Sequence, residues 1–396
     1  MLKLLKLRIN LGFLVNPFYI FSFAFFLAVV VYLWGWSAIF PKLSACLLGF
    51  LIISTILFVI VGHTIDIKIL IRNQANNYEY LDEIIFGFII TLGILNVIMM
   101  GYLPILSQSH DYRQFGIPVL DPVFSSLSIF FSAFFFQSFL VSKKRKLLLF
   151  VFILLVFQIL IFRRSTIVWI VTSSSFLYLF YKQKINLLII IASIACLPVL
   201  SYCFGYFGNK RSNLSESYVI NDLGASDSFK SSGISYNHYI TYLYVSSPLA
   251  NLQRNVNEGH GFINKGDLNN FFFYNILPQS FTMRMEESLK LTPPGCFLIM
   301  PHLIVGTFLM VSFFTLGWLG MTLMLLYLFL IIILCLLVIK KWDTFSVSTF
   351  SILVTTVSLL IFSNFLNRLD VLLMLFVYPV LFHFLYTSIA KKSEVY

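Results

Sequence analysis

Charged residues and cysteines are scarce in this chain. Only 11% of its 396 residues are Asp, Glu, Lys or Arg, whereas 59% are hydrophobic. Soluble globular domains carry about 25% charged residues, so the composition excludes a soluble domain. The five cysteines contain no CxxC motif, and their odd number indicates no disulfide framework. Cys203 and Cys296 bracket a long polar segment and would either pair across it or act as two small buried hydrophobes; we expect the second.

The signatures of nucleotide and metal chemistry are also missing. The chain has no GxxxxGK[ST], GxGxxG or HExxH motif. It also has no Asp-x-Asp pair, the arrangement that would place a divalent metal on a nucleotide-sugar diphosphate. We therefore expect no cofactor, no bound metal and no nucleotide-dependent step. The net charge of +11 does not indicate nucleic acid either, because cytoplasmic Lys and Arg give membrane proteins the same excess.

Long apolar runs dominate what is present. Runs of about 20 apolar residues are typical of transmembrane helices, because the hydrocarbon core of a bilayer is about 30 Å thick. Ten such runs are predicted to be helices, at about 18–35, 43–62, 84–104, 123–141, 147–162, 166–181, 185–205, 316–339, 345–363 and 371–389. The predicted fold class is therefore all-α, a polytopic integral membrane protein with about ten transmembrane helices and one large outer loop.

The predicted spans divide the chain into three parts. Residues 1–205 hold seven N-terminal transmembrane helices, residues 206–315 form the large outer loop, and residues 316–396 hold three C-terminal transmembrane helices and a cytoplasmic tail. The basic segment 1–10 precedes the first apolar run without an obvious small-residue cleavage site, which predicts an uncleaved signal anchor.

The distribution of Lys and Arg predicts the orientation. With the N-terminus inside, 15 of these 27 residues fall in cytoplasmic segments and five in short outer loops, and the other seven lie in 206–315. We expect a membrane protein with both termini in the cytoplasm. Arg163, Arg164 and Arg368 fall outside against this trend. They either reach lipid headgroups or form a cationic site for an anionic ligand.

The long outer loop carries two recognisable features. Tyr236 and Tyr239 begin a helical pattern, and Ser247 followed by Pro248 indicates the cap and first turn of a second helix. This pair of amphipathic helices would lie in the membrane interface, with its tyrosines at headgroup level or stacked on sugar rings. Further on, residues 297–312 are apolar but too short for a full span, and we expect a re-entrant or interfacial piece.

Arginine is the residue type on this outer side that points to a ligand. Arg254 and Arg284 lie in the long loop, in addition to the three arginines above. A guanidinium binds phosphate through paired, charge-assisted hydrogen bonds, each worth about 1.5–3 kcal/mol. Two or three converging arginines would therefore hold a lipid diphosphate at the bilayer surface.

In these features the chain resembles the bacterial O-antigen, or oligosaccharide repeat-unit, polymerases of the Wzy type. The resemblance covers the arrangement of many spans with one large late loop, and locally the segments YLYVSSPLANLQRN and PHLIVGTFLMVSFFTLGWLGM. Some members carry an Arg-x10-Gly motif in periplasmic loops. Arg284 to Gly295 has that spacing, and no second copy starts at Arg211 or Arg254.

The resemblance implies a protein of the bacterial inner membrane, whose large outer loop is periplasmic and whose reaction takes place at the periplasmic face. An acceptor hydroxyl attacks the anomeric carbon of a glycan, and undecaprenyl diphosphate leaves. The implied partners are an undecaprenyl-diphosphate-linked oligosaccharide, membrane lipid, a flippase and a chain-length regulator. The candidate substrate-binding residues are the outer cations and two aromatic residues, namely Arg163, Arg164, Arg254, Arg284, Arg368, Tyr236 and Tyr239. The candidate bases for the acceptor hydroxyl are His302, His238 and Glu258, although His302 also fits a buried histidine in an apolar run.

Three other functions remain open from the sequence. An O-antigen ligase also has many spans and a large periplasmic loop, and would transfer the finished glycan to lipid A-core. A lipid-linked oligosaccharide flippase or other transporter would place ionisable groups near the bilayer midplane. This chain has mainly Asn96, Gln137 and Gln158 there, which are typical of helix–helix contacts. A purely structural membrane protein would not explain the outer arginines.

Overall fold

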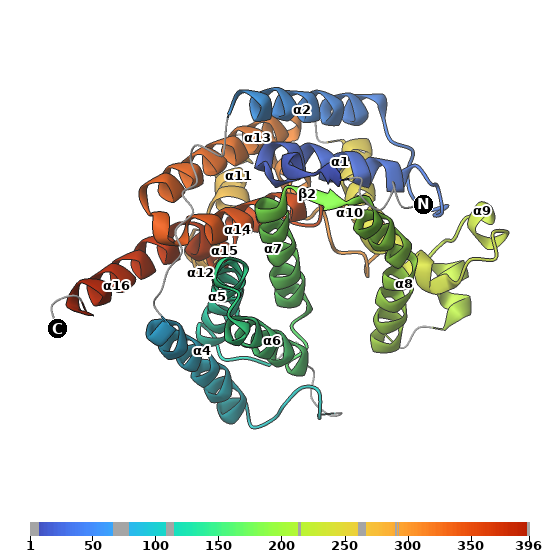
Figure 1. The fold of residues 1–396 in the computed structure, drawn as a ribbon. Helices are drawn as coiled ribbons and strands as arrows, with labels where there is room; N and C mark the ends of the chain where they lie inside the picture. Colours follow the sequence, from blue (N-terminus) through green and yellow to red (C-terminus); the bar gives the residue numbers. More distant parts are fainter. Residues whose placement is uncertain are drawn as a thin grey trace.

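The computed structural model describes residues 8–65, 79–107, 115–212, 215–259, 267–289, 291 and 293–393, and this part of the chain is almost entirely helical (Figure 1). Each of the ten predicted apolar runs coincides with a helix. These are α1 (Pro17–Tyr32), α2 (Ala45–Thr64), α4 (Glu79–Met100), α5 (Leu120–Ser142), α6 (Arg145–Leu160), α7 (Arg164–Lys182), α8 (Leu187–Ser212), α13 (Met310–Lys341), α14 (Ser346–Leu359), and the pair α15 (Leu369–Leu372) and α16 (Tyr378–Ser393), which a π-helical stretch Leu373–Val377 joins.

Six helices among the described residues are long and apolar enough to cross a membrane. They are Ala45–Thr64, Tyr80–Met100, Leu120–Ser142, Leu187–Asn209, Met310–Lys341 and Leu369–Ser388. The helix α1 and the stretch Asp343–Leu359 are apolar but shorter. A helical membrane protein is therefore indicated, and the number of ten spans stays a prediction.

The centre of the bundle is built on α5, α7 and α14. In α14 every residue from Ser346 to Val357 is buried. In the most apolar stretch of α5, 72% of the residues are buried, whereas no residue is buried in the corresponding stretch of α8. These central helices are rich in Ser and Thr, small side chains that allow close helix approach in a membrane protein. The helices α2, α4 and α8 lie at the edges of the bundle (Figure 1).

A single long helix replaces the predicted helix pair of the outer loop. The helix α10 runs without a break from Tyr236 to Glu258, and Pro248 lies inside it, so the predicted start of a second helix at Ser247 is wrong. Fourteen of its 23 residues are buried, and it packs against α8, α1 and α13. It therefore belongs to the core of the fold, and the prediction that its apolar face rests in the membrane interface is not supported.

Polar side chains of α10 hold an irregular segment in place. Asn255 donates its side-chain N–H to the Phe297 carbonyl (2.8 Å) and accepts from the Phe297 N–H (3.0 Å). Asn251 donates to the carbonyls of Leu303 (2.6 Å) and Val305 (2.8 Å). The predicted short piece 297–312 is thus non-helical up to Leu309, since these amides satisfy backbone groups that a helix would pair internally.

The helix α13 begins earlier than predicted and is kinked. It starts at Met310, and the backbone leaves helical geometry at Leu316 and Gly317, where the φ of Gly317 is 57°. The predicted span began at 316, so the sequence pattern located the part of the helix beyond the kink. The kink brings Gly320 against the backbone of Ser312, where a Cβ atom would lie 2.0 Å from the carbonyl oxygen.

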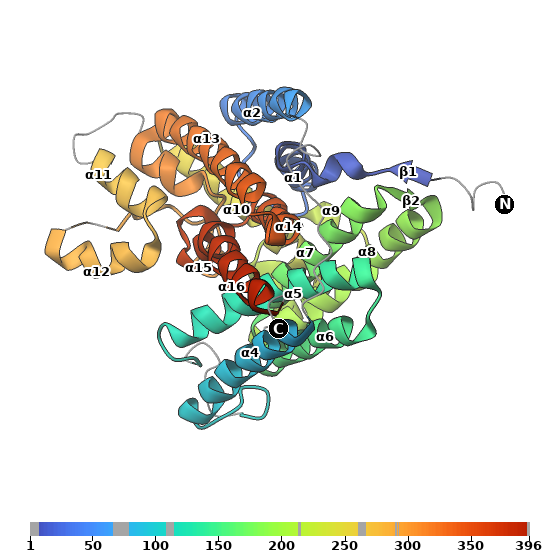
Figure 2. The same cartoon turned by 60° about the vertical axis from the view of Figure 1, so that its left-hand side comes forward.

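The remaining elements include three short helices and a two-stranded sheet. The short helix α9 (Asp227–Lys230) packs with Tyr239 and Trp36 in a second apolar cluster. The helices α11 (Asp267–Phe271) and α12 (Gln279–Leu289) project from the bundle (Figure 2). At another side, strand β1 (Arg8–Asn10) pairs antiparallel with β2 (Lys184–Asn186).

Candidate functional site

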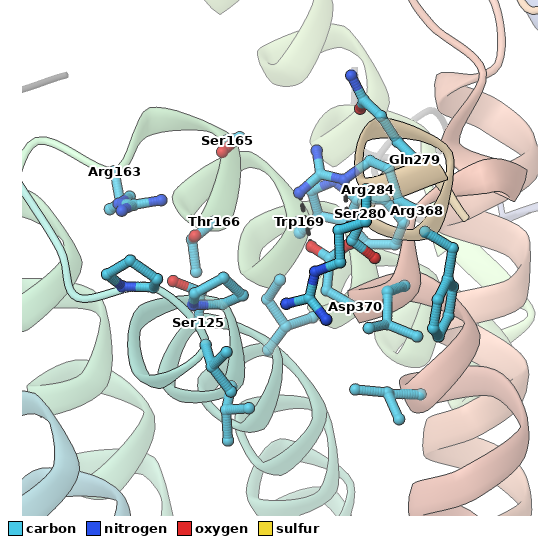
Figure 3. Close-up of a pocket in the computed structure, with 18 residues that line it drawn as sticks. Ser125, Arg163, Ser165, Thr166, Trp169, Gln279, Ser280, Arg284, Arg368 and Asp370 are labelled. Carbon is cyan, nitrogen blue, oxygen red and sulfur yellow. Dashed lines mark hydrogen bonds and ion pairs between the residues drawn. The ribbon is translucent and has the colours of Figure 1, made fainter. Parts of the chain in front are cut away.

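Three of the predicted arginines line one cavity. Arg163, Arg284 and Arg368 come from three distant parts of the sequence and border a cavity of about 400 Å³ between α5, α7, α12 and α15. Arg163 lies on one side of this cavity, and Arg284 and Arg368 lie on the other (Figure 3). We call it the arginine cavity.

The cavity also lies at the N-terminal ends of three helices of eight or more residues. Its walls include Pro122 in the first turn of α5, Ser165 in the first turn of α7 and Ser280 in the first turn of α12. The N-terminus of a helix carries a partial positive charge, because its first backbone N–H groups have no partner within the helix. Helix ends and arginines therefore place positive charge on the same small volume.

Arg163 is fixed by a buried carboxylate. It forms an ion pair with Asp121, whose side chain is 6% exposed, and donates to the Phe115 carbonyl (3.2 Å). Asp121 also accepts a hydrogen bond from the Asn96 amide (3.0 Å), and Asn96 in turn accepts from the Ile117 N–H (3.0 Å). This network joins α4, the link before α5 and the start of α7, so the guanidinium has a defined position at the cavity.

Arg368 is held by a carboxylate inside the cavity. Its Nε and Nη2 atoms donate to the two carboxylate oxygens of Asp370, at 3.0 and 2.6 Å, in a bidentate pair (Figure 3). The guanidinium also lies over the ring of Phe365, 5.5 Å from its centroid. Asn367 donates to the carbonyl of Tyr274 (3.0 Å) and thereby ties this loop to the segment that precedes α12.

Arg284 has no such partner. It lies on the exposed side of α12, and its side chain makes no hydrogen bond or ion pair with any described residue. The helix that carries it is anchored, because Thr282 is buried and donates to the Phe273 carbonyl (2.6 Å), and Tyr274 donates to Glu286 (3.2 Å). The position of the cation is set by α12, and its hydrogen-bond donors remain available to a ligand.

The charges of the cavity do not cancel. Asp121 offsets Arg163, and Asp370 offsets Arg368, which leaves the charge of Arg284 and the three helix ends in excess. The other polar groups are neutral. Among them, the hydroxyl of Ser125 is buried and has no hydrogen-bond partner among the described residues. The arrangement suits an anion that also carries hydroxyl groups.

Two predicted arginines do not line the cavity. Arg254 donates to the carbonyls of Leu298 (2.6 Å) and Ile299 (3.3 Å), and its Nε atom lies 3.9 Å from Glu258. It therefore helps to fix the irregular segment beside α10, and Glu258 lies with it, away from the other arginines. Arg164, the first residue of α7, is half-buried and is not among the residues that line the cavity.

The predicted histidines and tyrosines also lie elsewhere. Tyr239 is fully buried and donates to the Leu223 carbonyl (2.7 Å), and this burial raises the pKa of its phenol, so its ring cannot stack on a sugar. Tyr236 accepts a hydrogen bond from the Asn209 amide (3.2 Å). His238 lies 3.0 Å from the Ser201 hydroxyl in an apolar groove between α8 and α10. His302 is exposed, so neither a buried histidine nor a base in the arginine cavity is supported.

The sequence reasoning missed three polar groups of the site. Asp370 is the carboxylate that lines the cavity, Asp121 is the carboxylate that pairs with Arg163 behind it, and Ser125 supplies the unpartnered hydroxyl. A signal was present for Asp370, because it lies two residues after an arginine that breaks the charge distribution of the outer loops. Asp121 and Ser125 had no such signal, since their neighbours at the site come from other helices.

Comparisons of the chain with protein-family models, with curated proteins and with solved structures find no match. Within the described part of the chain, no three His, Cys, Asp or Glu side chains are grouped as ligands for a metal ion. The five cysteines are all free thiols, so Cys203 and Cys296 do not pair. The proposal below therefore depends on the arginine cavity.

Proposed function

We propose that the protein is an O-antigen or similar surface-polysaccharide polymerase, which joins undecaprenyl-diphosphate-linked oligosaccharide repeat units at the periplasmic face of a bacterial inner membrane. The observation that carries the proposal is the arginine cavity, in which Arg163, Arg284 and Arg368 meet the N-terminal ends of three helices. Such a site fits a diphosphate. Because the cavity belongs to a bundle of apolar helices, the natural diphosphate there is one carried by a lipid.

The positions of the basic residues support a periplasmic site. The cavity lies at the N-terminal ends of α5 and α7, and the opposite ends of the same two helices carry Lys143 and Lys182. Strand β2, which follows α7, adds Lys184 and pairs with Arg8 near the N-terminus. Since cytoplasmic ends are the ones enriched in Lys and Arg, this distribution favours a cavity on the outer side and both termini in the cytoplasm.

The proposed reaction needs positive charge at one place. An acceptor sugar hydroxyl attacks the anomeric carbon of the donor glycan, the bond from this carbon to the diphosphate oxygen breaks, and the lipid diphosphate leaves with the electron pair. Arg284 has free donors for the leaving oxygens, and Arg163 and the helix ends add to the field. A flippase that supplies the donor and a regulator that sets the chain length are the partners we propose for such a reaction.

The first test is genetic. Deletion of the gene is expected to leave single repeat units on lipid A-core, because ligation does not need polymerisation. Arg284→Ala, which removes an unpaired cation from the cavity, is expected to reproduce this pattern on a gel of surface polysaccharide. Loss of one charge-assisted contact worth about 1.5–3 kcal/mol lowers transition-state stabilisation roughly 10- to 150-fold.

A matched control separates the site from general loss of charge. Arg145 lies at the start of α6, next to the lysines at the opposite end of the bundle, and Arg145→Ala is expected to leave the chain-length pattern unchanged. If deletion removes single repeat units as well as long chains, the protein is a ligase. If Arg284→Ala makes long chains as the wild type does, the arginine cavity is not the polymerase site.

A further inference from the structure

None of the predicted bases reaches the arginine cavity. His238 lies in the groove between α8 and α10, Glu258 lies beside Arg254, and His302 is exposed away from the cavity. Among the described residues that line the cavity, Asp370 carries the sole carboxylate, and its side chain is 15% exposed. A transfer reaction in this cavity would therefore find Asp370 as the nearest group that can take a proton.

We propose that Asp370 is the catalytic base that takes the proton from the acceptor hydroxyl during glycosyl transfer. This inference rests on the proposed function, and it names the residue that completes the same site. The geometry supports it because the carboxylate lies within the cavity next to Arg368, one of the groups that would hold the departing diphosphate. The base, Asp370, and the residue that stabilises the leaving group, Arg368, are thus only two residues apart in the sequence.

Binding of the diphosphate would release the Asp370 carboxylate from its ion pair with Arg368, so that it can act as a base. Without ligand, both oxygens of Asp370 accept from Arg368. A diphosphate competes for the same guanidinium donors, because bidentate binding to phosphate uses the geometry that binds carboxylate. When Arg368 turns to the diphosphate, at least one oxygen of Asp370 is free to accept a hydrogen bond from a sugar hydroxyl.

The proton balance of the step is closed. The acceptor O–H bond breaks and its proton moves to an oxygen of Asp370, while the acceptor oxygen forms the new bond to the anomeric carbon. The old bond to the diphosphate oxygen breaks at the same time, and the lipid diphosphate leaves as an anion. The proton then returns to solvent through the open side of the cavity, and the carboxylate is restored.

A second polar group points to a hydroxyl-bearing ligand in this place. Ser125 lines the same cavity, and only 6% of its surface is exposed. Its hydroxyl has no hydrogen-bond partner among the described residues. A buried hydroxyl without a partner is costly, and a sugar hydroxyl would supply the missing bond. Ser125 on α5 and Asp370 on α15 would then contact the acceptor together.

The other groups that face Asp370 are cationic or phenolic. Arg368 contacts it directly, Arg163 and Arg284 line the same cavity, and the phenol of Tyr378 on α16 lies within electrostatic range of its charge. Asp121 is already paired with Arg163.

The experiment uses the full-length protein in liposomes, with native lipid-linked oligosaccharide extracted from a strain that lacks the gene. Asp370→Asn keeps the size of the side chain and removes the base. We expect its turnover number to fall about 10²- to 10⁴-fold, with a KM within a few-fold of the wild type. We also expect the wild-type rate, but not the variant rate, to fall at low pH, because a protonated carboxyl can no longer accept a proton.

The alternative is that Asp370 only orients Arg368, and the same measurements separate the two roles. A positioning role predicts a raised KM with an unchanged shape of the pH profile, and that result would overturn the assignment. If Asp370→Asn does not fold, Asp370→Glu, which keeps the ion pair, decides the question. Asp370→Glu moves the carboxylate by one methylene, so a base predicts a lowered turnover number with a KM within a few-fold of the wild type, and an unchanged turnover number with a raised KM would reject the base.

Failure of the base and failure of the polymerase proposal give different results. If Arg284→Ala stops chain growth and Asp370→Asn retains a tenth or more of the turnover, the polymerase site stands and the base is another group. If both variants polymerise as the wild type does, the cavity has no part in the reaction, and both proposals fall.

Discussion

The arginines that the sequence predicted on the outer side differ in what their guanidinium groups contact. Arg163 and Arg368 pair with carboxylates at the cavity, Arg284 is exposed there without a partner among the described residues, and Arg254 donates to two backbone carbonyls. In the sequence, Arg163 and Arg368 were exceptions to the distribution of Lys and Arg, whereas Arg254 and Arg284 were candidates because they lie in the long loop. The sequence could not separate them, because the partners of each lie far away along the chain.

This difference predicts opposite outcomes for two substitutions of the same type. Arg254→Ala leaves the carbonyls of Leu298 and Ile299 without their donor, so the free energy of unfolding in detergent should fall by about 1–3 kcal/mol. Arg284→Ala removes no hydrogen bond to a described residue and should change stability by less than about 0.5 kcal/mol. Denaturant or thermal unfolding of the purified proteins measures both.

Polymer formation should show the reverse order. Per folded molecule, the Arg254 variant should retain chain growth and the Arg284 variant should lose it. Equal stability of the two variants, together with loss of chain growth in the Arg254 variant, would place Arg254 in the reaction and contradict the arrangement described here.

At the scale of the element, the sequence located helices well and their roles less well. The ten apolar runs all coincide with helices, because length and hydrophobicity are local properties of the chain. The error at Ser247 and Pro248 has a physical reason. A proline after a serine usually opens a helix, but α10 continues through it, and 14 of its residues are buried against other helices. Such burial depends on partners that no local pattern reveals.

The kink of α13 gives a prediction at this scale. Gly317 has a φ of 57° and a ψ of −140°, a conformation that costs a residue with a side chain about 1–3 kcal/mol. Gly317→Ala should therefore lower the free energy of unfolding by this amount or straighten the helix, and thermal unfolding in detergent measures the loss. Gly49→Ala is the matched control, since Gly49 lies inside α2 and an added Cβ would meet no atom within 4 Å.

The two glycine variants should therefore differ in stability. Alanine is the better helix former by about 1 kcal/mol, so Gly49→Ala should keep or raise stability. A Gly317 variant as stable as the wild type would show that the kink is not fixed by the backbone conformation at this residue.

At the scale of the whole molecule, the sequence predicted a cationic site on one side and the structure specifies its members. Arg163, Arg284 and Arg368 meet in one cavity, whereas the predicted bases and tyrosines lie outside it. Segments that are distant in the sequence build the cavity, so only the packing of α5, α7, α12 and α15 decides which residues share it. The same packing explains why Asp370 and Ser125 became candidates only once the structure was known.

The side of the membrane on which the cavity opens is the last prediction, and cysteine labelling in cells tests it. Ser288 is exposed on α12, the helix that carries Arg284 of the arginine cavity. Ser142 is exposed at the C-terminal end of α5, next to the basic residues 143–146. A membrane-impermeant maleimide applied to spheroplasts should label Ser288→Cys at once and Ser142→Cys only after lysis. The measurement is the fraction of each protein that gains the mass of the reagent.

The native thiols leave this test readable. Burial raises the pKa of Cys296 to about 12, so at pH 7–8 it forms almost no thiolate and reacts slowly. Cys46 and Cys196 are exposed and Cys203 is half-buried, so these three are replaced by serine in all test proteins. Labelling of Ser142→Cys before lysis and of Ser288→Cys only after it would show that the arginine cavity faces the cell interior. The proposed polymerisation of lipid-linked repeat units takes place outside the cytoplasm. A polymerase acting at the periplasmic face could not use a site with that orientation.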